Sequence, residues 1–212
     1  MPPIPQPTSL MRLVIALVAL TVVACQSRDR AADSTVVAGG DTPPACVEGV
    51  GAPTLTAAGV GPVRLGASMS EISQRCTVRD SSFTLGEGIM ERGRVIDLGM
   101  ATVVVLVTED AEPTVSRVIV NDPAIRTEAG VGVGRDVASM RAAYGTLCAA
   151  MGEGRVVLMA PPLPGVSFGI SQRPSSLPRG GAGIDRTPEA IPDSSTITSI
   201  WVHGASTNCG GS

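Results

Sequence analysis

The hydrophobic positions of the chain form three kinds of pattern: one unbroken run near the N-terminus, two short segments with helical spacing, and several strand-like runs. The unbroken run is Leu13–Ala24, LVIALVALTVVA, and it follows Arg12. A spanning helix needs about 20 apolar residues, so this run is too short to cross a bilayer. A positive residue before an apolar run of this length is typical of a secretory signal peptide. The alternative is a buried core segment.

Two segments, 59–76 and 128–145, have helical spacing and resemble each other. Each has a Gly-rich stretch, then a residue that caps helices, then apolar residues three or four positions apart. Ser68 begins an S-x-x-E capping box in the first segment, and Asp136 caps the second. Gly145 is expected to end the second helix. The apolar positions are Met69 and Ile72 in the first segment, and Val137, Met140, Ala143 and Tyr144 in the second.

Several runs of β-branched and apolar residues predict strands. The clearest is 101–108, ATVVVLVT, in which Val103–Val107 are all apolar, so both faces of this strand should be covered. The turn at 109–113 predicts a hairpin with the next run, VSRVIV at 115–120. That run is matched by ITSIWV near the end of the chain. Weaker candidates are 81–85 and 94–98, and 155–160 and 166–171 are further strand-like runs.

The matching helical segments and the matching final runs predict an internal repeat. The second half is longer, and its extra residues fit the Pro-, Gly- and Ser-rich stretch 174–188, which should be an exposed loop. We therefore predict an α+β fold of two degenerate repeats, 46–126 and 127–212, each a short helix packed on an antiparallel β-sheet. The two sheets would either pack together or join into one larger layer.

Composition narrows the classes of protein that the chain can represent. Of its 212 residues 43% are hydrophobic and 17% charged, and the formal net charge is −3. Such a chain is too apolar to be wholly disordered. The 16 basic residues are all Arg and are scattered, and aromatic residues make up 2%. With neither a basic stripe nor stacking platforms, we expect no nucleic acid as a partner.

The apolar run ends in Val22-Val23-Ala24-Cys25, which resembles the lipobox of bacterial lipoproteins. The resemblance implies that residues 1–24 are a cleaved signal peptide and that Cys25 carries a diacylglycerol and an acylated amine. Gln26, where Asp would mark inner-membrane retention, resembles the pattern of Gram-negative lipoproteins sent on to the outer membrane. Residues 26–45 are small and polar, so 25–45 should form the lipidated Cys and a flexible linker. The protein would face the periplasm, held to the membrane by lipid.

Four further cysteines remain: Cys46, Cys76, Cys148 and Cys209. An even number in an exported protein suggests disulfides, and four cysteines allow three connectivities. The repeat favours one bridge in each half, which pairs Cys46 with Cys76 and Cys148 with Cys209. Free buried thiols are the alternative. The absence of a CxxC sequence argues against a thioredoxin-type motif or a zinc knuckle.

The Gly-rich block with its capped helix, followed by an antiparallel sheet, resembles the helix-then-sheet units of the SmpA/OmlA outer-membrane assembly lipoproteins. It is also similar to the tandem units of β-lactamase inhibitor proteins. Each likeness covers about 18 residues per half, and the second half departs from the pattern at Arg135, Asp136 and Ser139. The resemblance implies a binding or scaffolding module rather than an enzyme.

Catalytic and metal-binding chemistry finds little support in the sequence. His203 is the only histidine, and no G-x-S-x-G elbow accompanies it, although a hydrolase would have to use it. The glycines of 130–134 lack the Lys of a phosphate-binding loop. The acidic turn at 109–112 lacks the ligand spacing of a calcium loop. We expect no cofactor and no metal.

The final strand carries the most informative aromatic residue, Trp201. Strand alternation turns Ser199, Trp201 and His203 to the face opposite the helix, with Ile119 in the equivalent place on the matching strand. This face is either the contact between the two halves or a candidate interaction surface, since Trp favours interfaces.

These observations predict a non-enzymatic binding or scaffolding module, anchored at Cys25, with an envelope protein as its partner. A periplasmic small-ligand carrier and an envelope hydrolase using His203 are the alternatives.

Overall fold

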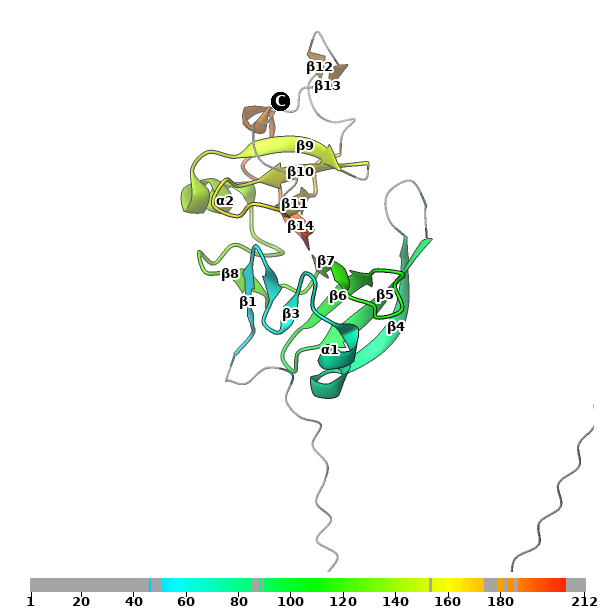
Figure 1. Ribbon diagram of the computed structural model, residues 1–212. Coiled ribbons are helices and arrows are strands. Elements are labelled where there is room, and N and C mark those ends of the chain that lie inside the picture. Colours follow the sequence, from blue (N-terminus) through cyan, green and yellow to red (C-terminus); the bar gives the residue numbers. More distant parts are fainter. Residues whose placement is uncertain are drawn as a thin grey trace, which may run out of the picture. The chain divides into compact units, whose positions relative to one another are not determined.

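The computed structural model describes residues 46, 51–84, 88, 90–152, 154–173, 179–180, 183–184 and 187–204 (Figure 1). All of them fall within one structural unit, Asp41–Ser212. The predicted signal peptide, Cys25, the linker up to residue 45 and Cys209 lie outside the described residues, as does most of the predicted loop 174–188.

The main layer is one eight-stranded sheet in which every neighbouring pair is antiparallel. The predicted alternatives of two packed sheets or one larger layer are thus resolved in favour of one layer. In sheet order its strands are β4 (Thr77–Thr84), β5 (Met90–Asp97), β6 (Thr102–Val107), β7 (Val115–Val120), β14 (Ile197–Val202), β11 (Val166–Ile170), β10 (Arg155–Met159) and β9 (Cys148–Gly152).

Two smaller sheets complete the described strands. The four-stranded sheet has the order β3-β2-β1-β8, and β1 pairs with β8 in parallel. Its bounds are β1 (Thr54–Thr56), β2 (Gly59–Val60), β3 (Val63–Arg64) and β8 (Arg126–Thr127). A two-stranded sheet pairs β12 (Arg179–Gly180) with β13 (Gly183–Ile184), and a short 3-10 helix, η3, spans Pro188–Ala190.

The two α-helices begin where the capping residues predict. Helix α1 is Met69–Arg75, and the Ser68 hydroxyl accepts a hydrogen bond from the Ser70 amide at 3.2 Å. This bond replaces the predicted capping box, in which the acceptor would have served the amide of Glu71. Helix α2 is Val137–Tyr144, capped by Asp136 and ended by Gly145 at φ 69°.

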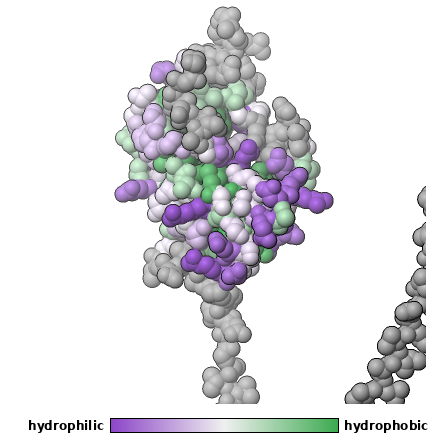
Figure 2. All heavy atoms as spheres, in the orientation of Figure 1, coloured by the Kyte–Doolittle hydropathy of each residue, from purple (hydrophilic) through white to green (hydrophobic). Residues whose placement is uncertain are grey.

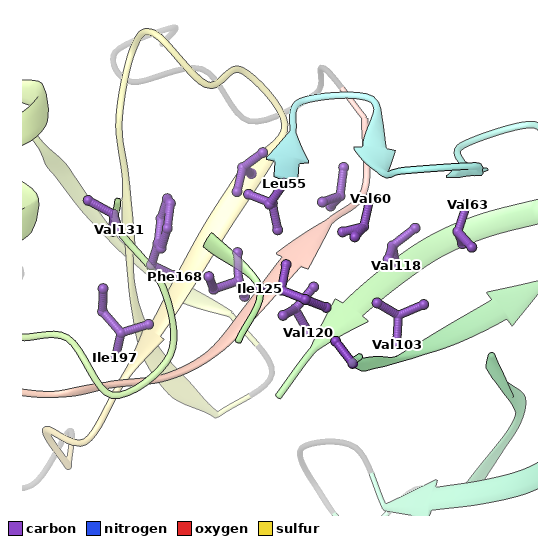
Figure 3. Packing of buried hydrophobic residues seen from close by; sticks show 14 of the residues in the cluster. Leu55, Val60, Val63, Val103, Val118, Val120, Ile125, Val131, Phe168 and Ile197 are labelled. Atoms are coloured by element: carbon purple, nitrogen blue, oxygen red, sulfur yellow. The ribbon is translucent and has the colours of Figure 1, made fainter. Parts of the chain in front are cut away.

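Both helices and the four-stranded sheet pack on one face of the eight-stranded sheet and form the main core. Figure 3 shows Leu55 and Val60 of the small sheet directed toward Val118 and Val120 of the large one. Helix α2 contributes Val137 and Met140, which are fully buried, whereas Ala143, predicted on the same apolar face, is exposed. On the surface seen in Figure 2, hydrophilic side chains gather over β4 and β5.

The last strand of each of two sets, β7 and β14, lies at the centre of the eight-stranded sheet. Helix α1 precedes β4, β5, β6 and β7, and helix α2 precedes β9, β10, β11 and β14. The two sets of strands join where β7 pairs with β14, with Ile200 opposite Val120 and Val202 opposite Val118. The fold is α+β, with short helices and mostly sheet.

Candidate functional site

The candidate site lies on the face of the eight-stranded sheet opposite the helices. Strand register puts Ser167, Trp201, Ile119 and Val104 in one row across β11, β14, β7 and β6. Their neighbours at the next rows, on the same face, include Ser199 and Leu106. Trp201, Ile119, Leu106, Phe83 and Val104 form a second hydrophobic cluster, separate from the main core.

This cluster borders a small hollow with a volume of about 110 Å³. The apolar wall of the hollow consists of Phe83, Val104, Ile119 and Trp201. Its polar lining consists of Thr84, Asn121, Arg155 and Ser199. The hollow is therefore lined by residues of both β4 and β10, which are separated by five strands in the sheet order.

The four residues of the candidate interaction surface lie in two places in the structure. Ile119, Ser199 and Trp201 meet in the hollow. His203 follows the end of β14 and lines a wider hollow of about 840 Å³, together with Leu106 and Arg117. Charged and polar side chains make up most of that second lining. Trp201 itself is 9% exposed and packs in the second hydrophobic cluster, on one face of the single eight-stranded sheet.

Two glycines make room for the side chains of the hollow. A Cβ atom at Gly93 of β5 would overlap the ring of Phe83, so only glycine lets that ring lie against the sheet. A Cβ atom at Gly169 of β11 would lie 2.6 Å from Ser199 Oγ. Both glycines thus determine where the walls of the hollow stand.

The polar groups of the hollow differ in how they are satisfied. Ser199 is 3% exposed, and its hydroxyl makes no hydrogen bond in the structure. A buried hydroxyl without a partner loses its hydrogen bonds to water without compensation. Arg155 is exposed at the rim, and its guanidinium makes no ion pair or hydrogen bond with any described residue. On the same face of the sheet, the Arg117 guanidinium carbon lies 5.8 Å from the centroid of the Trp201 indole ring.

His203 does have a serine partner. Ser167 Oγ lies 2.8 Å from His203 Nε2, and Ser167 itself is 5% exposed. A serine nucleophile must be reached by its substrate, and Ser167 lines neither of the two hollows described above. This position favours a structural hydrogen bond over a catalytic one.

Among the described residues, the two ionisable groups with a shifted pKa both lie away from the hollow. Hydrogen bonds from the Ser139 hydroxyl and amide lower the pKa of Asp136 at the start of α2. Burial raises the pKa of Tyr144, whose hydroxyl donates a hydrogen bond to Thr127 Oγ1 at 2.6 Å. Both groups belong to the helix side of the sheet.

Among the described residues, no group of three or more His, Cys, Asp or Glu side chains is placed to hold a metal ion. In the same part of the chain, none of the helices has the length and apolarity needed to cross a membrane.

Cys46 and Cys76 are joined in a disulfide, with their Cα atoms 4.4 Å apart. Cys76 is the residue that ends α1, so the bridge fastens the start of the described chain to this helix. Cys148 is also disulfide-bonded. Its expected partner, Cys209, lies outside the described residues, and that pairing stays a prediction.

Sequence reasoning missed several residues of the hollow. Phe83 could have been found from the register of β4. Side chains alternate along a strand, so every second residue of β4 lies on the same face of the sheet as Trp201. Arg155 comes from a strand near the far edge of the sheet, and only the curvature of the folded sheet brings it near Phe83. Asn121, directly after β7, gave no signal beyond its place in a turn.

Comparisons with known proteins identify no family for this chain. No protein-family model matches the chain, and no curated protein matches it. Among solved structures, the chain is similar to the crystal structure of the uncharacterized protein yfeY from Escherichia coli, with a TM-score of 0.44 and 18% sequence identity. The likeness covers 70% of this chain and 97% of that one.

Proposed function

We propose that this chain is an exported bacterial lipoprotein, held at the outer membrane by lipid on Cys25, whose folded part binds another envelope protein. The lipobox, the short apolar leader and the polar linker support the anchor. The disulfide of Cys46 with Cys76 fits an oxidising compartment. Binding would use the sheet face around Trp201 and would need no covalent chemistry.

The observation that carries this proposal is the hollow beside Trp201. Sites for metabolites usually enclose about 300–1,000 Å³ and bury most of the ligand. A hollow of about 110 Å³ is too small for that and suits a single side chain from a larger partner. Trp201 and the nearby Arg residues are the types that most often anchor protein interfaces.

The order of helices and strands supports the proposed repeat and places this face between its two halves. In the proposed repeat, α1 with β4–β7 corresponds to α2 with β9–β11 and β14. The repeats meet at β7 and β14, which carry Ile119 and Trp201 in paired positions. The binding face would then lie at the seam between the two halves.

One alternative keeps a specific observation in its favour. The 2.8 Å bond between Ser167 and His203 is the contact that an envelope hydrolase would use. That function would require Ser167 to become exposed. The carrier alternative would require a larger apolar cavity than the hollow offers.

Site-directed photocrosslinking in intact cells tests the proposed function. Benzoylphenylalanine replaces Phe83 in one strain and Met100, an exposed residue of the β5–β6 turn, in the control strain. We expect a discrete crosslinked envelope protein from position 83 but not from position 100, and its loss in the Trp201→Ala background. Thermal unfolding of that variant checks its fold. The same products from both positions, or products indifferent to Trp201, would refute a partner on this face.

A further inference from the structure

The hollow beside Trp201 sets the size of what can enter it. An apolar cavity of about 150 Å³ holds a benzene molecule. At about 110 Å³ the hollow takes one aliphatic side chain, which would contact Phe83, Ile119 and Trp201. The rest of the ligand would have to lie along the surface of the sheet.

The polar lining sets the chemistry next to that side chain. Arg155 is the one charged residue that lines the hollow, and it has no partner among the described residues. A guanidinium at the rim favours a carboxylate, because its N–H groups match the geometry of the two oxygens.

The second polar group of the hollow is uncharged. The Ser199 hydroxyl is buried without a hydrogen-bond partner, directly beside Gly169. Buried polar groups are nearly always hydrogen-bonded in folded proteins. An orphan hydroxyl in the wall of a hollow therefore points to a partner supplied from outside, such as a peptide group.

We propose that the hollow binds a polypeptide segment in which an aliphatic side chain lies next to a carboxylate. The aliphatic group fills the space against Trp201, the carboxylate pairs with Arg155, and a backbone group of the segment bonds to Ser199. This inference rests on the proposed function and specifies what the partner presents to the binding face.

Fluorescence titration tests the inference, because Trp201 is the only tryptophan of the chain and reports on the hollow directly. The probes are acetyl-Leu-Asp-amide and acetyl-Leu-Asn-amide, which have nearly the same shape and differ in charge. They are added to the full chain with its disulfides intact. We expect a saturable change with both probes and an affinity about two- to fivefold higher for the Asp probe, as for an exposed ion pair.

Variants of the two polar groups sharpen the test. The Arg155→Gln variant should bind both probes with equal affinity. The control variant Arg135→Gln, changed on the helix side of the sheet, should keep its preference for the Asp probe. The Ser199→Ala variant should lose affinity for both probes by a similar factor, so the ratio of the two affinities should not change. Circular dichroism verifies that each variant is folded.

Two results would overturn the inference: no saturable change in Trp201 fluorescence, or equal affinity of the wild type for the two probes. Either result would leave the proposed function standing if crosslinks from position 83 still depended on Trp201. Conversely, a preference for the Asp probe without Trp201-dependent crosslinks would support the chemistry of the hollow and refute the envelope partner.

Discussion

At the scale of single residues, the candidate site depends on two glycines in the strands. Gly93 and Gly169 carry no side chain, and this absence lets Phe83 and Ser199 occupy their places in the walls of the hollow. Neither glycine has a positive φ, so close packing and not backbone conformation accounts for them. A glycine inside a strand commonly marks such a close approach.

The sequence predicted part of this arrangement. Strand alternation correctly turned Trp201, Ser199 and Ile119 to one face, because the period of two holds through β7 and β14. It did not predict that Ser199 would lack a hydrogen-bond partner, since that depends on which atoms of β11 lie beside it.

Asp136 is the residue whose ionisation should affect stability. Hydrogen bonds from Ser139 lower its pKa in the folded state, so the folded protein binds this proton less readily than the unfolded chain. The resulting stabilisation is complete above about pH 4, the ordinary pKa of an Asp side chain, and is lost as the pH falls through the lowered folded-state value.

The variant Asp136→Asn keeps a residue that caps helices but cannot titrate. We expect the difference in melting temperature between wild type and D136N to be constant near neutral pH and to shrink on acidification below about pH 4. Thermal unfolding from pH 2 to 7 measures it, with Asp110→Asn, in the exposed β6–β7 turn, as the control. A difference that grows as the pH falls would contradict the role given to Asp136.

At the scale of elements, strong signals were predicted well and weak ones poorly. The prediction that the apolar run 101–108 forms a strand covered on both faces is confirmed in β6. The main core covers one face, and the cluster of Leu106 and Trp201 covers the other. Strands β4 and β5 are longer than predicted. Polar residues on their outward face hide their full length in the sequence, and it becomes evident only from the eight residue pairs that join the two strands. The four-stranded sheet was missed, since its two- and three-residue strands carry no period.

The pairing of β7 with β14 makes a testable claim about cooperativity. Ile200 is fully buried at this junction, opposite Val120 on one side and Phe168 on the other. We expect Ile200→Ala to lower the free energy of unfolding by about 2–5 kcal/mol. Because both sets of strands share one core, denaturation should remain a single transition for both far-ultraviolet circular dichroism and Trp201 fluorescence.

Met90→Ala is the matched control for that experiment. Met90 is 62% exposed, so its truncation should change the free energy of unfolding by less than about 0.5 kcal/mol. Two separate transitions in the wild type, or an Ile200→Ala loss as small as that of the control, would show that the two sets of strands do not form one core.

At the scale of the whole molecule, the proposed function places a lipid anchor and a linker before the disulfide-bonded α+β domain. The disulfide closes a loop of 30 residues in sequence separation, which corresponds to roughly 3–4 kcal/mol of stabilisation in the loop-entropy picture. The domain type could be predicted because apolar periods and cap residues are local signals. The curvature that brings Arg155 toward Phe83 could not, because it arises only when all eight strands are assembled.

The central claim, on which the compartment, the disulfides and the envelope partner all depend, is export and lipidation at Cys25. The most direct measurement is the intact mass of the protein purified from membranes, with and without reductant. The account predicts residues 25–212 with a diacylglycerol and an acyl chain on Cys25, and a gain of four hydrogen atoms on reduction, two for each disulfide. An unprocessed chain that starts at Met1, carries no lipid and has free thiols would contradict it.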